Sequence, residues 1–389
     1  MIPYGRHKIE KDDIDAVVAV LKSEMLTCGE AVRAFEDTLS QTVSSRYTVS
    51  CSSGTAALHL CMMALGIGSG DSVIVPGITF LASANAAQYV GADVVFADVD
   101  PATGLMTPET LEKAILENKE KNIKAIINVH MAGQCEDLES MHAIAKKQGI
   151  FLIEDAAHAI GSNYISKKGD MYPIGSNAFS DLTTFSFHPV KNIAMGEGGA
   201  VTTNSLDLKN KLSLFRNHAM ERDKEKIASE NKNKPWYYEM QHLGYNFRAS
   251  DIHCALGISQ LKKLASFKKS REESVSFYDQ AFSKLEYLTP ICKLPSCDPV
   301  WHLYVILIDF KHIEIPREIF MQLLSSRGIR TQVHYIPVYK QPYYKDLYGS
   351  NELPGCESYY KRCLSIPLFV GLSKAMQEKV IQEVLKHVK

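Results

Sequence analysis

The stretch TTFSFHPVKNIAMGEGGAVTTN, residues 183–204, joins two β-type runs through a single lysine and a glycine-rich turn. Short runs of β-branched and aromatic residues that are bounded by glycine are typical of strands. The stretch therefore predicts successive strands at 182–187 and 199–204, with Lys191 in the connection. A lone ammonium group between a strand and such a turn needs an explanation.

The same kind of run recurs at regular intervals earlier in the chain. Helix-length segments separate these runs, and two of the segments, residues 54–66 and 107–120, have helical apolar spacing. Thr107 and Pro108 supply a cap and a first-turn residue for the second helix. The pattern predicts an α/β fold with a large, mostly parallel, seven-stranded sheet covered by helices. The five earlier strands are expected at 47–53, 72–77, 93–99, 124–130 and 150–157.

The pattern changes after residue 204. Residues 221–235 are charged and almost free of apolar side chains, which predicts a loop. A helical stretch at 250–282 then leads to shorter β-type runs at 301–310 and 331–339. We expect a large domain over residues 1–264, whose N-terminal segment packs on the small domain, and a smaller C-terminal α/β domain over residues 265–389.

Composition narrows the class of protein. The chain has 389 residues, 46% hydrophobic and 22% charged, and its 43 basic and 44 acidic side chains leave a net charge of -1. These values are ordinary for a soluble globular protein and give no sign of a nucleic-acid or anionic-membrane partner. No secretory signal or membrane-spanning run is apparent. Nine scattered cysteines without CxxC spacing favour reduced thiols in the cytoplasm and no metal site.

Polar side chains follow three of the predicted strands. In open α/β sheets, ligands bind just beyond the carboxyl ends of the strands. Gly54 and Thr55, at the start of a helix, could hold an anion such as phosphate through backbone N–H groups, or belong to a plain helix cap. Asp155 follows a buried strand and could serve a ligand or a structural ion pair. His158, three residues later, could equally be a packed histidine. Lys191 could be a reactive neutral amine or a solvated lysine.

One cofactor would use all three strand ends. Pyridoxal phosphate (PLP) needs a lysine for its aldehyde, an acid for its pyridine nitrogen and N–H donors for its phosphate. Each signal is weak alone, but together they predict a PLP site. Lys191 would then be the residue that bonds to the cofactor.

Several longer motifs carry a family likeness. In order, they resemble the DegT-type nucleotide-sugar aminotransferases of PLP fold type I over nearly the whole chain. The resemblance implies a PLP-dependent transferase fold with the large and small α/β domains described above. The motifs are SSGTAAL (52–58), PGITFLASANA (76–86), IEDAAHAIGS (153–162), residues 183–204, FRNHAM (215–220), LGYNFRASDIHCALGISQL (243–261) and RGIRTQVHYIPVY (327–339).

The resemblance assigns the residues around the cofactor ring. Lys191 would bond to the aldehyde and act as acid and base, and Asp155 would pair with the pyridine nitrogen. His158 would lie beside the ring near its 3-hydroxyl group, and Phe80 would stack on the ring face. A lysine at this position, where relatives that dehydrate a sugar have histidine, favours transamination.

The resemblance also assigns the phosphate contacts. Gly54 and Thr55 would donate backbone N–H groups and Ser186 its hydroxyl. Asn246 would reach the phosphate of the other subunit's cofactor, which implies a homodimer with shared active sites.

The substrates follow from the same likeness. The expected reaction moves an amino group from glutamate to C4 of a UDP-linked 4-keto-6-deoxy-N-acetylhexosamine, in pseudaminic acid or related surface-sugar biosynthesis. Sugar-nucleotide contacts are expected from Thr27, Arg248, His334 and Tyr335. The alternatives are another keto nucleotide sugar, dTDP- or GDP-linked, and a non-catalytic PLP-binding regulator, although no DNA-binding appendage is evident. A nucleotide-binding α/β module without PLP is a further alternative. No GxGxxG or GxxxxGK(S/T) phosphate loop follows any of the predicted strands, which argues against it.

Two positions depart from the family pattern. Ala194 stands where many relatives have threonine, and Ala219 replaces a common glycine in FRNHAM. We expect local adjustment at the mouth of the site.

Overall fold

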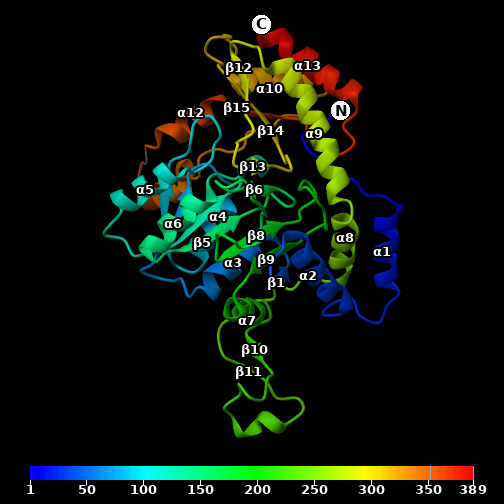
Figure 1. Cartoon of the computed structure of the whole chain (residues 1–389), viewed down its shortest axis with the longest axis vertical. Helices are drawn as coiled ribbons and strands as arrows, with labels where there is room; N and C mark the ends of the chain where they lie inside the picture. The colour runs from blue at the N-terminus through cyan, green and yellow to red at the C-terminus, as the bar shows by residue number, and fades with distance from the viewer. Residues whose placement is uncertain (351, 389) are drawn as a thin grey trace.

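A seven-stranded sheet forms the centre of the computed structural model, which describes residues 1–350 and 352–388 (Figure 1). The spatial order is β1-β9-β8-β5-β4-β2-β3. All seven strands predicted for this sheet are present, and the predicted fold class is confirmed. Their bounds are β1 Tyr47–Cys51, β2 Ser72–Pro76, β3 Asp93–Ala97, β4 Ile123–Val129, β5 Phe151–Asp155, β8 Leu182–Ser186 and β9 Gly199–Thr203.

Strand direction decides where the functional side chains lie. The pairs β3–β2, β2–β4, β4–β5 and β5–β8 are parallel, and only β9 runs antiparallel to its neighbours β1 and β8. The carboxyl ends of β4, β5 and β8 therefore meet at one edge of the sheet. Val129 pairs with Asp155 at this edge, and Ser186 ends β8 beside them.

Helices cover both faces of the sheet, because side chains alternate between the faces along each strand. Val73 and Val75 of β2 pack in one core with α3, α4 and α7. Ile74, between them, packs in another core with α5 and α6. Further along that face, Phe185 packs with α2 and α8. The helices are α2 Glu30–Val43, α3 Gly54–Ala64, α4 Leu81–Tyr89, α5 Pro108–Glu117, α6 Leu138–Gln148, α7 Leu206–Phe215 and α8 Asp251–Leu261.

A second, antiparallel sheet of order β12-β14-β15 forms after the long helix α9 (Leu264–Phe282). Its core also contains Ile2, whose N–H donates to Gly328 O at 2.7 Å. Strand β13, from the same part of the chain, pairs with β6 in a three-stranded sheet that also contains β7. The boundary between a large and a small domain at residue 265 therefore stays a prediction. The strands are β6 Asn163–Ile165, β7 Met171–Pro173, β12 Leu288–Pro290, β13 Cys297–Asp298, β14 Tyr304–Ile308 and β15 Cys363–Ile366.

The remaining elements complete the outline. Helix α1 lies along α8, and α9, α10 and α13 gather beside the second sheet (Figure 1). Their bounds are α1 Lys11–Leu21, α10 Arg317–Ser326, α11 Pro342–Tyr348, α12 Pro354–Arg362 and α13 Lys374–Val388, with short 3-10 turns η1 Met131–Gly133, η2 Glu230–Asn233 and η3 Val338–Lys340. In the described part of the chain, no helix is both long and apolar enough to cross a bilayer.

The charged segment 221–235 is a loop, as predicted. It belongs to an arm that projects from the body of the molecule and starts with a two-residue pairing of β10 (Met220–Glu221) with β11 (Glu239–Met240) (Figure 1). Only the short turn η2 interrupts it.

The strand predicted at 331–339 is wrong. This segment is irregular: Gln332 makes a single bridge to Ser365, and a 3-10 turn follows at Val338–Lys340. Pro337 has no N–H to give to a ladder, and the Val338 N–H donates to Gly77 O at 2.9 Å in the large sheet's loop. Instead, the irregular backbone brings the consecutive residues His334 and Tyr335 to a cavity.

Candidate active site

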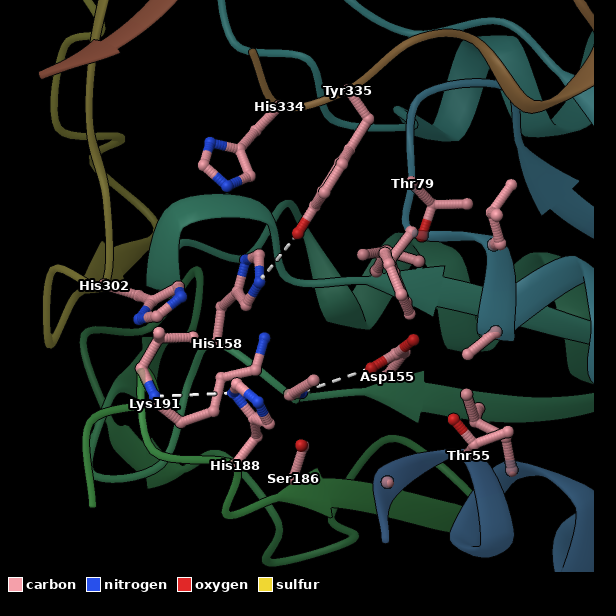
Figure 2. Close-up of a pocket in the computed structure, with 18 of the residues that line it drawn as sticks. Thr55, Thr79, Asp155, His158, Ser186, His188, Lys191, His302, His334 and Tyr335 are labelled. Atoms are coloured by element: carbon pink, nitrogen blue, oxygen red, sulfur yellow. Dashed lines mark hydrogen bonds between the residues drawn. The ribbon is translucent and has the colours of Figure 1, made fainter. Parts of the chain in front are cut away.

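A cavity of about 540 Å³ opens at the carboxyl ends of β4, β5 and β8, above the N-terminus of α3 (Figure 2). Loops of the large sheet form one side, and the irregular segment around His334 and Tyr335 forms the other. The cavity brings together nine of the twelve predicted site residues. These are Gly54, Thr55, Phe80, Asp155, His158, Ser186, Lys191, His334 and Tyr335.

The other three predicted residues do not line this cavity. Thr27 is exposed and bridges to Ser250. Asn246 is exposed and bridges to Asn217, whose Oδ1 also accepts from Arg248 Nη1 at 2.5 Å. A role for them in substrate or partner-subunit binding stays a prediction.

Lys191 lies in the turn that follows β8, held by a 2.8 Å hydrogen bond from its N–H to His188 O. Its amine lines the cavity between the two sides (Figure 2). Burial lowers the pKa of Lys191 from its ordinary value of 10.5 to about 8, because desolvation disfavours the ammonium, while the negative charge of Asp155 opposes this shift. A useful fraction of the amine is therefore neutral near neutral pH.

Asp155 ends strand β5 and is 6% exposed. Its Oδ2 accepts from Ser83 Oγ at 2.8 Å, and its Oδ1 accepts from the Ala157 N–H at 3.2 Å. Within residues 1–350 and 352–388 it forms no salt bridge, so the groups in direct contact with its carboxylate are neutral hydrogen-bond donors. A buried carboxylate in this state suits a cationic ligand group.

Sequence reasoning missed the support beneath Asp155. Ser83 Oγ also contacts Thr79 Oγ1 at 2.8 Å, so the two hydroxyls form a chain that ends on the carboxylate. Both residues belong to the quoted motif around Phe80, and Ser83 follows Phe80 by one helical turn. Helical spacing within that motif could have placed Ser83 at the same edge of the sheet.

His158 follows β5 in a turn and is buried. Its Nε2 lies 3.2 Å from the Tyr335 hydroxyl (Figure 2), and its ring centroid lies 4.3 Å from that of His302. Burial, reinforced by the positive charge of Lys191, holds the pKa of His158 well below its usual range, so the ring is neutral. His158 Nδ1 is a buried atom without a partner in the described residues, which a ligand group could satisfy.

His302 lines the cavity and was not predicted, since nothing in its local sequence marks it. His334 contacts Ser365 Oγ through Nδ1 at 2.8 Å, and burial lowers its pKa to about 3. Burial also raises the pKa of Tyr335 well above its usual range. This side of the cavity therefore consists of neutral rings. Phe80, 57% exposed, faces Tyr335 with ring centroids 6.0 Å apart.

The N-terminus of α3 forms the floor of the cavity. Ser53 is the helix cap, and its side chain accepts from the Ala56 N–H at 3.1 Å. Gly54 and Thr55 follow in the first turn, where N–H groups have no partner inside the helix and favour an anion. A Cβ on Gly54 would lie 2.7 Å from Ser186 Cβ. The narrow space between the helix and Ser186 thus depends on glycine.

Gly54→Ala is expected to weaken PLP binding about tenfold to a hundredfold, because relieving such a clash costs about 1–3 kcal/mol. The measurement is an absorbance titration of cofactor-free protein with PLP. Gly68→Ala is the matched control, since its Cβ would meet only Val90 O at 3.7 Å. Equal affinities for the two variants would contradict a phosphate site at this helix end.

The two departures from the family pattern lie away from the cavity lining. Ala194 is buried, and its N–H donates to Gln260 Oε1 at 3.4 Å. Ala219 is buried with φ of 51°, the left-handed region that glycine adopts without strain. Neither residue lines the cavity of its own chain, and the expected adjustment at the mouth of the site stays a prediction.

These features fit PLP in three independent respects. Lys191 supplies an amine of lowered pKa, Asp155 a buried carboxylate without a salt bridge, and the first turn of α3 brings Gly54 and Thr55 to the cavity, where N–H groups without helical partners favour an anion. All nine cysteines are free thiols. No group of three or more His, Cys, Asp or Glu residues is arranged to hold a metal ion in the described part of the chain.

Comparison with known proteins gives one consistent result. The family model described as the DegT/DnrJ/EryC1/StrS aminotransferase family matches residues 7–385. The chain is 40% identical over 367 residues to the UDP-4-amino-4,6-dideoxy-N-acetyl-beta-L-altrosamine transaminase of Campylobacter jejuni, covering 94% of this chain and 92% of the relative.

Solved structures agree with the sequence comparison. Helicobacter pylori PseC, an aminotransferase involved in the biosynthesis of pseudaminic acid, superposes with a TM-score of 0.89 and 32% identity, covering 100% of this chain and 99% of PseC. The PLP form of the putative sugar aminotransferase Spr1654 from Streptococcus pneumoniae superposes with a TM-score of 0.88 and 28% identity, covering 100% of both chains. The chain belongs to the DegT/DnrJ/EryC1/StrS aminotransferase family.

Proposed function

We propose that the protein is a PLP-dependent aminotransferase that moves an amino group from glutamate to C4 of a UDP-linked 4-keto-6-deoxy-N-acetylhexosamine, in pseudaminic acid or related surface-sugar biosynthesis. The observation that carries the proposal is the pair Lys191 and Asp155, which follow the adjacent parallel strands β8 and β5 into one cavity. The names of the Campylobacter jejuni and Helicobacter pylori proteins support the choice of sugar.

The side chains of the cavity have complementary tasks in this proposal. PLP, when bound, supplies an electron sink for negative charge at the carbon that carries the amino group. Asp155, oriented by Ser83 and the Ala157 N–H, would hold a proton on the ring nitrogen. Gly54 and Thr55 would hold the phosphate with Ser186.

The ring itself would be held from both sides. Phe80 would cover one face of the ring, and His158 would lie at its edge, where the unpartnered Nδ1 can meet the 3-hydroxyl group. His334 and Tyr335 would contact the sugar from the opposite wall, because they close the cavity there. Thr27 and Arg248 would contact the nucleotide.

Lys191 would both bond to the cofactor aldehyde and move protons. Its amine, with a pKa of about 8, is basic enough to take the proton from the Cα of glutamate and is still partly neutral near pH 7. In the second half of the cycle, the protonated amine would deliver a proton to C4 of the sugar. Such positioned acid–base groups typically contribute about 10²–10⁴ in rate.

A panel of UDP-, dTDP- and GDP-linked 4-keto-6-deoxy sugars, each incubated with glutamate and PLP, tests the proposal. The UDP-linked N-acetyl sugar is expected to gain an amino group at C4, seen by mass spectrometry and NMR, with equimolar 2-oxoglutarate. Omission of glutamate is the control. Amination of a dTDP- or GDP-linked sugar alone would support the alternative substrate, whereas PLP binding without any amination would support a non-catalytic regulator.

We also propose that the active unit is a cytoplasmic homodimer whose subunits share their active sites. Asn246 is exposed and lies outside the cavity of its own chain, as a residue offered to a partner would. The nine free thiols suit a reducing compartment.

Mixed dimers test the sharing of sites. Lys191→Ala and Asn246→Ala are each expected to be impaired alone. Random exchange of subunits makes half of the dimers hybrids, and each hybrid has one intact composite site, so activity should recover to about a quarter of the wild-type value. Activity is measured after exchange has been verified with differently tagged subunits. A verified mixture that stays as inactive as its parents would contradict shared sites.

A further inference from the structure

Three residues that precede β14 form a strap across the cavity-facing turns: Val300, Trp301 and His302. The Val300 N–H donates to Ser162 Oγ at 2.8 Å, and the His302 N–H donates to Ala132 O at 2.9 Å. The carbonyls of Trp301 and His302 accept from the buried Arg271 Nη1 at 3.1 and 3.3 Å. The strap is therefore fixed to the turns after β4 and β5 and to helix α9.

Asn192 ties the strap to the third turn, the one that carries Lys191. It is 2% exposed, and its Nδ2 donates to Val300 O at 3.2 Å and to His158 O at 3.1 Å. The Asn192 side chain thus joins the Lys191 turn, to which it belongs, to the turn of His158 and to the strap. Its Oδ1 is buried without a partner in the described residues.

The unused oxygen shows what the position requires. A buried acceptor without a partner costs about 1–3 kcal/mol of stability. Because Asn192 Oδ1 is such an acceptor, we infer that the amide is present for the two N–H donors on its nitrogen. Two carbonyl oxygens from segments more than 100 residues apart in sequence converge on those donors. No apolar side chain of similar size could bridge them, and an aspartate would place an acceptor against two acceptors.

The strap also fixes a histidine pair. His302 sits at its end with the ring 4.3 Å from the His158 ring, and His158 in turn contacts Tyr335. Movement of the Lys191 turn relative to the strap would therefore change the distance between the amine and this row of rings. Asn192 is the side chain that spans that junction.

We propose that Asn192 is a positioning residue that holds the Lys191 turn, the His158 turn and the 300–302 strap as one unit, and so sets the place and dehydration of the Lys191 amine. Because Lys191 is the reacting amine only within the proposed function, the first readout uses cofactor-free protein and no substrate.

That readout is the pH dependence of Lys191 acetylation by acetic anhydride, followed by peptide mass spectrometry. The wild-type midpoint is expected near 8. Asn192→Ala frees the turn and admits water to the amine, so the midpoint should rise by at least about one unit toward the ordinary value. Asn192→Ser keeps one hydroxyl donor, so its acetylation midpoint should lie between those of wild type and Asn192→Ala. It replaces Asn192→Ala in the experiment if that variant does not fold.

Ser162→Ala is the matched control. Ser162 also holds the strap, through Val300 N–H and by donating to Gly133 O at 2.8 Å, but it does not bridge to the Lys191 turn. Its acetylation midpoint should equal that of wild type. In the loaded enzyme, Asn192→Ala should lower kcat about tenfold or more while KM for the sugar stays within about threefold, as for a misplaced reacting group.

An unchanged midpoint in both Asn192 variants, or an equal rise in Ser162→Ala, would overturn the role of Asn192. Failure of the wild-type protein to bind PLP or to aminate any sugar would instead refute the proposed function, and the acetylation midpoints would still decide the role of Asn192.

Discussion

Replacing Lys191 by alanine is expected to lower turnover by at least about a thousandfold, because in the proposed function this one change removes both the bond to the cofactor and the group that moves protons. Asp155 and the floor of the cavity stay in place, so the variant should still bind PLP. Its absorbance should resemble that of free PLP, since no side-chain amine is left to react with the aldehyde in this cavity.

The two half-reactions measure this effect separately. Mixing PLP-loaded Lys191→Ala with glutamate should give no fast spectral change, and the same variant loaded with pyridoxamine phosphate should not react with the keto sugar. A small primary amine in the buffer is expected to restore part of the rate, because it can carry the proton in place of the side chain. Lys262→Ala, which changes an exposed lysine at the end of α8, is the control and should keep wild-type activity.

Residual activity of Lys191→Ala within tenfold of wild type, a barrier change of only about 1.4 kcal/mol, would contradict the assignment of Lys191.

The second large effect is expected at Asp155. Asp155→Asn keeps the shape of the side chain and the contact with Ser83 but removes the charge. Loss of one partner from a buried charge pair costs about 3–5 kcal/mol. We therefore expect a fall of at least about a hundredfold in kcat/KM, together with weaker PLP retention during dialysis.

Ser83→Ala separates charge from orientation. It deletes one hydrogen bond to Asp155 Oδ2 and leaves the carboxylate charged, so a loss of about 1–2 kcal/mol, or roughly tenfold in kcat/KM, is expected. If Asp155→Asn proved no worse than Ser83→Ala, the charge of Asp155 would not matter to the reaction and its proposed role would be wrong.

Local sequence pattern was sufficient to predict the seven strands of the large sheet and to place Asp155 and Lys191 at one edge of it. A short apolar run that leads to Asp155 or to the turn of Lys191 identifies the carboxyl end of a buried strand, and parallel pairing brings such ends together. The seven strands of the large sheet were predictable for the same reason, since each is short, β-branched and bounded by turn residues. These signals are contained within a few neighbouring residues.

Contacts between distant segments were not predictable in this way. His302 reaches His158 from more than 100 residues away, and Asn192 contacts Val300 at a similar separation. The segment 331–339 has the composition of a strand, but its consecutive residues His334 and Tyr335 both line the cavity, and Pro337 has no N–H to give to a ladder. Composition alone does not distinguish a strand from such a cavity wall.

The resemblance to a family added what local chemistry does not give. Asn246 and Thr27 carry no signal of their own, and both lie outside the cavity of the single chain. Their proposed roles would depend on a second subunit and on the nucleotide, so mixed dimers and the sugar panel are the appropriate tests.

The most direct test of the central claim is borohydride reduction of the PLP-loaded protein, followed by trypsin digestion and mass spectrometry. Reduction makes the bond between the cofactor and its lysine permanent, and it should also block cleavage after that lysine. The phosphopyridoxyl mass is expected on Lys191 alone, in the peptide that continues through the missed cleavage site. Labelling of another lysine, or none on the Lys191 peptide, would contradict the account.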